Sequence, residues 1–535
     1  MMRSTRAVLC CGLLTTGLPA CGDTNAHLDN AAAGDAQSGG LAVICMLSRP
    51  DVLNSFASPE RSAADLRPVL FTPVVLYDSS GGFRPHLASG WQWSDDRRSL
   101  RLRVRDDLRW HDGTPVTAED VAWTLRTAAD SAYGYLGRAE LGEVESATAG
   151  EGVVDVVFRE PAGEVLEPLA RLPILPKHIL DSIPADGFQR ASYHREPVGS
   201  GPFRFAGRLP DGSVQLDRNP DYPHDLGTPL LDRVVLREVP EPSAILVELN
   251  TNGADACIVG SSVAKDAAAG GSTILPIVPV GALAIAVDNR KPPFDDVRVR
   301  RALSATLDRA EIAHVVSPAS APARNFLPDA SLRWRDTTLV QPDRDSTLAA
   351  ALLDSAGWRT GPQGRRTNAA GQPLRFTIFA PPPLQPLLTV VQAQFRRIGA
   401  EVELQLVESS VFIASLGDPA RRPAALAIIV VPDRIAVPDP YSEFHSASGY
   451  NLASYNRPEV DSIVERLRDV IPDSERGTLY RELQRYVAQD VPIIYTVHTP
   501  RVLAVRPRLR GVHVDANGPF THAAEWWIPV SERRR

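Results

Sequence analysis

The chain has 535 residues, of which 44% are hydrophobic and 23% charged, and its formal net charge at pH 7 is −7. This composition is ordinary for a soluble globular protein, and the length corresponds to about three or four domains. The slight acidic excess argues against a nucleic-acid-binding protein, and no segment offers the 18 or so uninterrupted apolar residues of a transmembrane helix.

The N-terminus has the pattern of a secretory signal. Arg3 and Arg6 precede an apolar run at 7–14, and a small residue precedes Cys21. The tetrapeptide Leu-Pro-Ala-Cys that ends at Cys21 resembles the lipobox of bacterial lipoproteins. The resemblance implies that Cys21 is lipid-modified and that the protein is anchored to a bacterial membrane outside the cytoplasm. A plain secretory signal with an incidental Cys is the alternative.

The first elements predicted after this region are a strand, a hairpin and a helix. Residues 41–47 (LAVICML) form a short apolar run that is typical of a buried strand. Residues 91–105 alternate between apolar and polar on both sides of a charged turn, which predicts a β-hairpin. Thr117 stands three residues before Asp120, a spacing that favours a helix start, and the helix is expected to reach about residue 129.

Strands and helices alternate through the rest of the chain. Asp296 is predicted to cap a helix over 296–309, whose apolar residues share one face. The other predicted elements are a strand at 153–158, helices at 347–356 and 388–398, and two helices within 459–490 that break at Pro472. This mixture predicts an α/β protein of several lobes.

Several motifs follow one another in a fixed order. They are 85–91 (PHLASGW), 109–121 (RWHDGTPVTAEDV), 197–203 (PVGSGPF), 218–222 (RNPDY), 292–300 (PPFDDVRVR), Ala356-Gly357-Trp358, Ile398-Gly399 and Asp439-Pro440. The ordered set, which spans about residues 41–527, resembles the family 5 extracellular solute-binding proteins. These are the dipeptide, oligopeptide and nickel receptors of ABC importers.

The resemblance implies a two-lobed periplasmic-binding-protein fold of the class II type, with hinge-linked α/β lobes, an extra subdomain, and the ligand cleft between the lobes. Ligand would favour the closed arrangement, which a membrane permease recognises. The expected division is a signal peptide (1–20), a flexible tether (21–40), a discontinuous lobe I (41–61, 169–262 and 488–535), the extra subdomain (62–168) and lobe II (263–487).

The motifs give no indication of an enzyme. The chain lacks a G-x-S-x-G sequence, a P-loop and an H-E-x-x-H sequence, and its 11 His show no ligand spacing. We therefore expect no cofactor and no metal site. His111-Asp112 is interpreted as a turn before the capped helix and not as a catalytic pair.

The resemblance also suggests ligand-binding residues. In peptide-binding members an Asp three residues before an Asp/Glu-Pro pair holds the α-ammonium of the ligand. The pair here is Asp439-Pro440, but Ala436 occupies the Asp position. Asp433, beside Arg434, is the substitute if the loop is longer, and the alternative is that Asp433 caps a turn.

Three further residues are candidates by position. His445 follows the Asp-Pro pair, where nickel-binding relatives place a His near the metal complex, although an ordinary surface or core His is the alternative. Tyr133 and Tyr135 follow the helix that starts at Thr117, where peptide-binding relatives place a Tyr in the cleft wall, with core packing as the alternative.

The family implies ABC permease and ATPase subunits as partners and a monomeric receptor. An oligopeptide is the expected ligand, because it is the commonest class in the family. A nickel complex, an oligosaccharide, or a sensory role without an importer remain alternatives. Whether Cys45 and Cys257 form a disulfide stays open, as does any role of Asp255.

Overall fold

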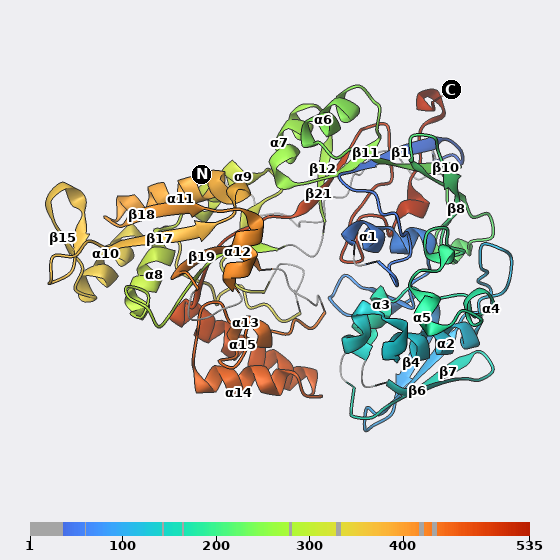
Figure 1. Cartoon of the computed structure of the whole chain (residues 1–535), viewed down its shortest axis with the longest axis horizontal. Coiled ribbons are helices and arrows are strands. Elements are labelled where there is room, and N and C mark those ends of the chain that lie inside the picture. Colours follow the sequence, from blue (N-terminus) through green and yellow to red (C-terminus); the bar gives the residue numbers. More distant parts are fainter. Residues whose placement is uncertain are drawn as a thin grey trace, which may run out of the picture.

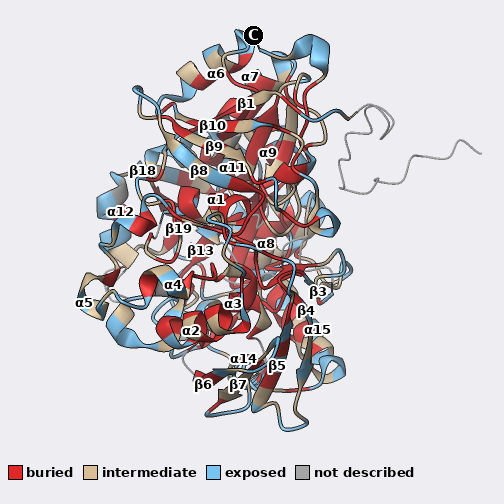
Figure 2. Ribbon diagram, turned by 90° about the vertical axis from the view of Figure 1, so that its right-hand side faces the viewer, coloured by how far each residue is buried: buried red, intermediate tan, exposed pale blue. Residues whose placement is uncertain are grey.

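The computed structural model describes residues 36–58, 60–141, 144–162, 165–277, 281–327, 333–416, 422–430 and 436–534. Within these ranges no helix has both the length and the apolar composition needed to cross a membrane. Figure 1 shows two lobes side by side, and Figure 2 shows that buried residues line the interior strands of both.

The first lobe is built on a seven-stranded sheet. The order is β12 (Thr273–Ile277), β21 (Arg501–Val505), β11 (Ala256–Val259), β1 (Leu41–Met46), β10 (Arg233–Glu238), β9 (Val214–Arg218) and β8 (Phe203–Arg208). β1 runs parallel to both of its neighbours, and its two faces pack into different hydrophobic clusters. One face lies towards α1 (Arg61–Leu70) and the other towards α6 (Pro242–Asn250) and α7 (Ser261–Ala269). Because both faces are covered, β1 is a continuous apolar run.

The second lobe is built on a six-stranded sheet. The order is β14 (Ala321–Pro322), β20 (Ile493–His498), β13 (Ala282–Val287), β19 (Ala425–Val430), β17 (Arg375–Ala380) and β18 (Glu401–Leu406). Leu283, Ile285 and Val287 of β13 pack with α8 (Val297–Thr306) and α11 (Gln385–Arg397). The alternate residues of β13 join a cluster that also contains first-lobe side chains such as Val75, so the two lobes share apolar packing.

A four-stranded antiparallel sheet lies beside the first lobe, with the order β4 (Ala88–Trp93), β5 (Ser99–Val104), β7 (Val153–Phe158) and β6 (Val144–Ala149). α2 (Ala118–Ala129) covers one face, and β2 (Val75–Tyr77) and β3 (Phe83–Pro85) form a separate ribbon. The short helices α3 (Leu166–Arg171), α4 (Lys177–Leu180) and α5 (Ala185–Phe188) connect this region to the first sheet. A second small ribbon, β15 (Arg359–Thr360) with β16 (Arg366–Thr367), lies in the second lobe.

Most of the predicted elements are confirmed. The strand at 41–47, the hairpin, the strand at 153–158 and the helix starting after Thr117 are all present. Thr117 and Asp120 form a complete capping box, in which Asp120 Oδ2 accepts from Thr117 N at 2.8 Å. The later helices are also present: α10 (Ser346–Ser355), α11, and the pair α14 (Pro458–Leu467) and α15 (Asp473–Asp490), with Pro472 at the N-cap of α15.

The predicted helix over 296–309 is wrong at its C-terminal end. Asp296 caps α8 as expected, but α8 ends at Thr306. Asp308 then caps a new helix, α9 (Arg309–Val316), because its carboxylate accepts from Glu311 N at 3.0 Å. The apolar periodicity alone cannot reveal this break, since Leu307 is buried and keeps the pattern.

Two of the family motifs, 109–121 and 197–203, contact each other. His111 Nδ1 accepts from Gly199 N at 3.0 Å, and its Nε2 donates to Gly201 O at 3.1 Å. A Cβ at Gly199 or Gly201 would collide with the carbonyl oxygens of Leu70 or Val69, so both glycines are required for this close approach. His111 is therefore a packing residue that joins the two motifs.

Two neutral histidines, the buried His194 and the half-buried His111, should make the protein acid-sensitive. Burial lowers the pKa of both His111 and His194 to about 4. The same histidines in the unfolded chain bind protons near pH 6.5. The stability that the two neutral imidazoles contribute to the folded protein is therefore complete above that pH, and it is lost as the pH falls towards 4. We expect a loss on the order of 2–3 kcal/mol per histidine. Urea midpoints at pH 7 and pH 4.5 measure this loss, and the midpoint of H111Q should fall less between the two pH values than that of the wild type. An equal fall would contradict the contribution of His111 to the acid sensitivity.

Candidate functional site

The chain passes between the two large sheets twice. It leaves the first sheet after β12 and enters the second at β13, and it returns between β20 and β21. The two crossings are hydrogen-bonded to each other, since Thr499 N donates to Gly281 O at 3.0 Å. Paired crossings of this kind form a hinge. The lobe limits expected at 262 and 487 stay a prediction. The chain itself passes from one sheet to the other at later positions, between β12 and β13 and between β20 and β21.

A buried carboxylate links the lobes at their contact, which we call the lobe junction (Tyr77, Glu167, Ala436 and Val437). Glu167 of α3 is fully buried. Its Oε2 accepts from Ala436 N at 3.2 Å and from Val437 N at 3.4 Å, while its Oε1 accepts from the Tyr77 hydroxyl at 2.9 Å. Burial and the neighbouring Glu167 carboxylate raise the pKa of Tyr77 well above its usual value. Glu167 thus ties the second lobe to the first through hydrogen bonds that its two carboxyl oxygens accept.

Other side chains fix the same backbone from the second lobe. Trp334 Nε1 donates to Ala436 O at 2.5 Å, and the Tyr480 hydroxyl donates to Pro438 O. The Trp334 and Tyr480 rings lie 5.4 Å apart. The segment 436–438 is therefore held rigidly, and Glu167 meets preoriented N–H groups.

Positive charge lies close to the buried carboxylate. Arg67 of α1 neighbours Tyr77, Tyr135 and Arg171, and burial lowers its pKa to about 10. Its Nε is buried and has no hydrogen-bond partner among the described residues. Burial alone would lower the pKa of Arg171, but Tyr77, Glu140 and Glu167 outweigh it and raise that pKa. An unsatisfied buried guanidinium nitrogen is costly, so Arg67 is suited to receive an anionic group.

The two predicted tyrosines lie on the first-lobe side. Tyr135 stacks on Phe56 with ring centroids 4.7 Å apart, and burial raises its pKa. Tyr135 also neighbours Arg67. Tyr133 packs edge-on against Phe188 at 5.1 Å. Of the two tyrosines, Tyr135 is therefore the one that lies beside Arg67, next to the lobe junction.

The second-lobe candidates are already engaged by local partners. Asp439 Oδ2 lies 3.4 Å from Arg468 Nε, and its Oδ1 accepts from Tyr441 N at 3.1 Å. His445 is buried; its Nε2 lies 3.0 Å from Glu465 Oε1, and its Nδ1 accepts from Ala447 N at 3.1 Å. Asp433, Arg434 and Cys21 lie outside the described residues.

Neither Glu167 nor Arg67 belongs to a motif, and neither was predicted from the sequence. A signal for Glu167 nevertheless exists. It is the only acidic residue in 165–175 (VLEPLARLPIL), and an acid in such an apolar stretch is buried only with partners. Arg67 has no comparable signal, because its helix carries two other charged side chains, Arg61 and Asp65.

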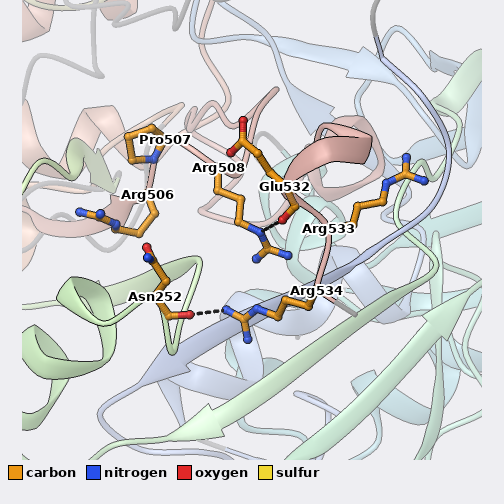
Figure 3. Close-up of a pocket in the computed structure, with 7 residues that line it drawn as sticks. All are labelled: Asn252, Arg506, Pro507, Arg508, Glu532, Arg533 and Arg534. Atoms are coloured by element: carbon orange, nitrogen blue, oxygen red, sulfur yellow. Dashed lines mark hydrogen bonds between the residues drawn. The ribbon is translucent and has the colours of Figure 1, made fainter.

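A pocket of about 490 Å³ lies elsewhere, at the C-terminal end of the first lobe (Figure 3), and is lined by Asn252, Arg506, Pro507, Arg508, Glu532, Arg533 and Arg534. Its arginines bond mainly to the protein itself. Arg534 Nη2 donates to Asn252 O at 2.9 Å and lies 3.3 Å from the buried Asp255, which also pairs with Arg508. Asp255 in turn accepts from Val43 N at 2.8 Å. These contacts fasten the C-terminal residues to β1, so we interpret the pocket as structural.

The structure pairs the two cysteines that the sequence left open. Cys45 of β1 and Cys257 of β11 form a disulfide between adjacent parallel strands. Disulfides persist in oxidising compartments, which agrees with export from the cytoplasm.

Comparisons with known proteins identify the family. The family model described as "Bacterial extracellular solute-binding proteins, family 5 Middle" matches residues 82–449. The oligopeptide-binding protein AppA of Bacillus subtilis is 24% identical, over 96% of this chain and 97% of the relative.

Solved structures share the fold. The ABC transporter substrate-binding protein CtaP of Listeria monocytogenes superposes with a TM-score of 0.79 at 21% identity, over 92% of this chain and 100% of the other. NikZ of Campylobacter jejuni, in complex with Ni(L-His), superposes with a TM-score of 0.70 at 20% identity, over 91% of this chain and 99% of the other. The two-lobed fold that the motifs implied is confirmed, and the chain belongs to the family 5 bacterial extracellular solute-binding proteins.

Proposed function

We propose that this protein captures an oligopeptide at the lobe junction and presents it to the permease of an ABC importer, with no catalytic step. The supporting observation is the pairing of opposite charges there. The Glu167 carboxylate lies near the Arg171 guanidinium group, and Arg67 neighbours Arg171 and Tyr77. A peptide carries a carboxylate that suits the Arg67 guanidinium and many backbone hydrogen-bonding groups, and a separate group is proposed below for its ammonium. The B. subtilis relative carries the name of an oligopeptide-binding protein.

Arg67 should bind a carboxylate of the peptide. We expect R67Q to weaken binding of short peptides with a free C-terminus by at least about 10-fold, and to affect C-terminally amidated peptides much less, because a charge-assisted bond contributes about 1.5–3 kcal/mol. Isothermal titration with both peptide forms measures this. R61Q is the matched control, since Arg61 lies on the same helix but is exposed and pairs with Asp65. Equal losses for both peptide forms would contradict the role of Arg67.

The group that receives the peptide ammonium is proposed to be Asp433, with Arg434 beside it, since Ala436 lacks a carboxylate. D433A should weaken a peptide with a free N-terminus and spare its acetylated form, because a buried ammonium without a partner is costly. Equal losses, or none, would remove Asp433 from this role. The remaining candidates are Tyr133, Asp439 and His445. We propose that they shape the surroundings of the bound peptide through the contacts described above.

We further propose a monomeric lipoprotein that is anchored through Cys21 outside the cytoplasm, with residues 21–40 as the tether and the lobe limits given above. Residues 37–40 bond to the first lobe, since Arg533 donates to Gln37 O at 2.9 Å and to Ser38 O at 3.0 Å, and Gly39 N donates to Leu230 O at 2.6 Å. Only the residues before Gln37 are therefore proposed as the spacer. C21A should move the protein from the membrane fraction to the soluble exported fraction; retention in the membrane fraction would exclude anchoring through Cys21.

A further inference from the structure

We propose that the segment after β21 holds a divalent transition-metal ion between His513, His522 and Glu525, with Asp515 supporting His522. Each of the three residues offers one ligand atom, and these atoms lie within 4.8 Å of one another. Two imidazoles and a carboxylate form a donor set that suits Zn²⁺ and related cations. This site is separate from the lobe junction and does not depend on the proposed transport role.

The geometry brings the ligand atoms together from one short stretch of chain. His522 Nδ1 lies 3.1 Å from Glu525 Oε1, and His513 Nδ1 lies 3.8 Å from Glu525 Oε2. The two imidazole rings are 3.7 Å apart between centroids. A tetrahedral zinc ion with bonds of 2.0–2.1 Å holds its ligand atoms about 3.4 Å apart. The side chains therefore need only small movements to reach coordination distance.

Asp515 supplies the support that a metal-bound histidine usually has. Its Oδ2 lies 3.0 Å from His522 Nε2, which leaves His522 Nδ1 for the ion. A carboxylate that accepts from the second ring nitrogen fixes the tautomer and the ring orientation. Asp515 is itself held, since Asn517 N donates to its Oδ1 at 2.8 Å and Asn517 Nδ2 to its Oδ2 at 2.9 Å.

The charges also favour a cation. The carboxylates of Asp515 and Glu525 together carry two negative charges. Against the opposing effect of burial, their hydrogen bonds raise the pKa of His522 to about 9, so a divalent ion must displace a proton from His522 when it binds. Arg84 of β3 faces Glu525 and competes with the ion. Because of this competition we expect an exchangeable ion with an open position for water, and not a closed structural site.

The position gives the site a structural consequence. Asn517 Oδ1 accepts from Tyr77 N at 2.7 Å, and Asn517 Nδ2 donates to Tyr77 O at 3.1 Å. Tyr77 in turn bonds to Glu167 at the lobe junction. An ion that joins His513 to Glu525 would thus stiffen the loop that holds Tyr77.

The test uses the mature protein after chelator treatment, with Zn²⁺ alone as the probe. Isothermal titration should show one equivalent bound by the wild type, at least about a 100-fold loss of affinity in H522A, and a loss of 10- to 100-fold in D515N, as for other supporting carboxylates. H224A is the matched control, because His224 is exposed and its ring bonds to Thr228 and to none of the three ligand residues.

Thermal unfolding gives a second readout if H522A folds poorly. Zn²⁺ should raise the Tm of the wild type and of H224A, but not that of H513Q, whose circular dichroism is expected to match the wild type. Zinc binding that H522A and H513Q leave unchanged would mark adventitious surface histidines only, and it would overturn the proposal, as would a wild type that binds no zinc.

Discussion

Replacing Glu167 with Ala is expected to open the ligand-free protein. The change leaves Ala436 N, Val437 N and the Tyr77 hydroxyl without their acceptor. Each unsatisfied buried donor costs about 1–3 kcal/mol, so the closed arrangement should lose more than about 100-fold in population. Small-angle X-ray scattering should report a larger radius of gyration, and peptide affinity should fall with it.

Two variants bracket this result. E167Q keeps an acceptor oxygen and should lose much less than E167A. E119A removes a half-exposed carboxylate of α2 that pairs with Arg126 of the same helix and with Lys177 of α4, and such a surface pair contributes at most about 1 kcal/mol. A radius of gyration and a peptide affinity in E167A that match those of E119A would contradict the role of Glu167 at the junction.

Replacing Arg309 with Met is expected to unfold the second lobe at moderate denaturant. Arg309 is fully buried at the start of α9, and burial lowers its pKa to about 10. Its Nε donates to Ala323 O at 3.0 Å and to Tyr495 O at 2.9 Å. The remaining acceptors of its guanidinium are the Ser304 carbonyl and hydroxyl, Pro342 O, Gln341 Oε1 and the Asp343 carboxylate.

Removing one guanidinium would therefore take a donor from each of these acceptors, although Gln341 Oε1, Pro342 O and Asp343 would keep another partner, in Tyr495 N, the Ser304 hydroxyl and Arg324. Breaking a buried pair in this way costs about 3–5 kcal/mol. Urea denaturation followed by circular dichroism measures the loss. The urea midpoint of R309K should lie between those of the wild type and R309M, because a Lys ammonium cannot reproduce the planar set of donors of a guanidinium. R397M is the control, since Arg397 is mostly exposed and lies 3.7 Å from Glu311. A midpoint for R309M within error of that for R397M would contradict this account.

The elements that were predicted correctly have local signals. The strand at β1 is an apolar run, the β4–β5 hairpin alternates about a polar turn, and α2 begins with a capping box. The break between α8 and α9 was not predicted because it depends on one carboxylate. Asp308 lies just after the end of α8 and caps the start of α9. The family motifs were recognised as a set, but their physical reason, such as His111 binding to Gly199 and Gly201, appears only in three dimensions.

The candidate site was harder to predict, because it is formed by residues far apart in the sequence. Glu167 and Ala436 are 269 positions apart and meet through the packing of one lobe against the other. Asp439 and His445 were chosen by position, yet their side chains bond to Arg468 and Glu465, whose proximity no spacing rule reveals. The same limit applies to the His513, His522 and Glu525 cluster, because its spacing matches no standard metal motif.

The measurement that tests the central claim most directly is native mass spectrometry of residues 22–535, purified without denaturation, with release and identification of any bound molecule. The account predicts a ladder of short peptide masses that R67Q reduces and R61Q retains. A single non-peptide mass, such as a metal complex or an oligosaccharide, bound equally by the wild type and R67Q, would contradict peptide capture at the lobe junction.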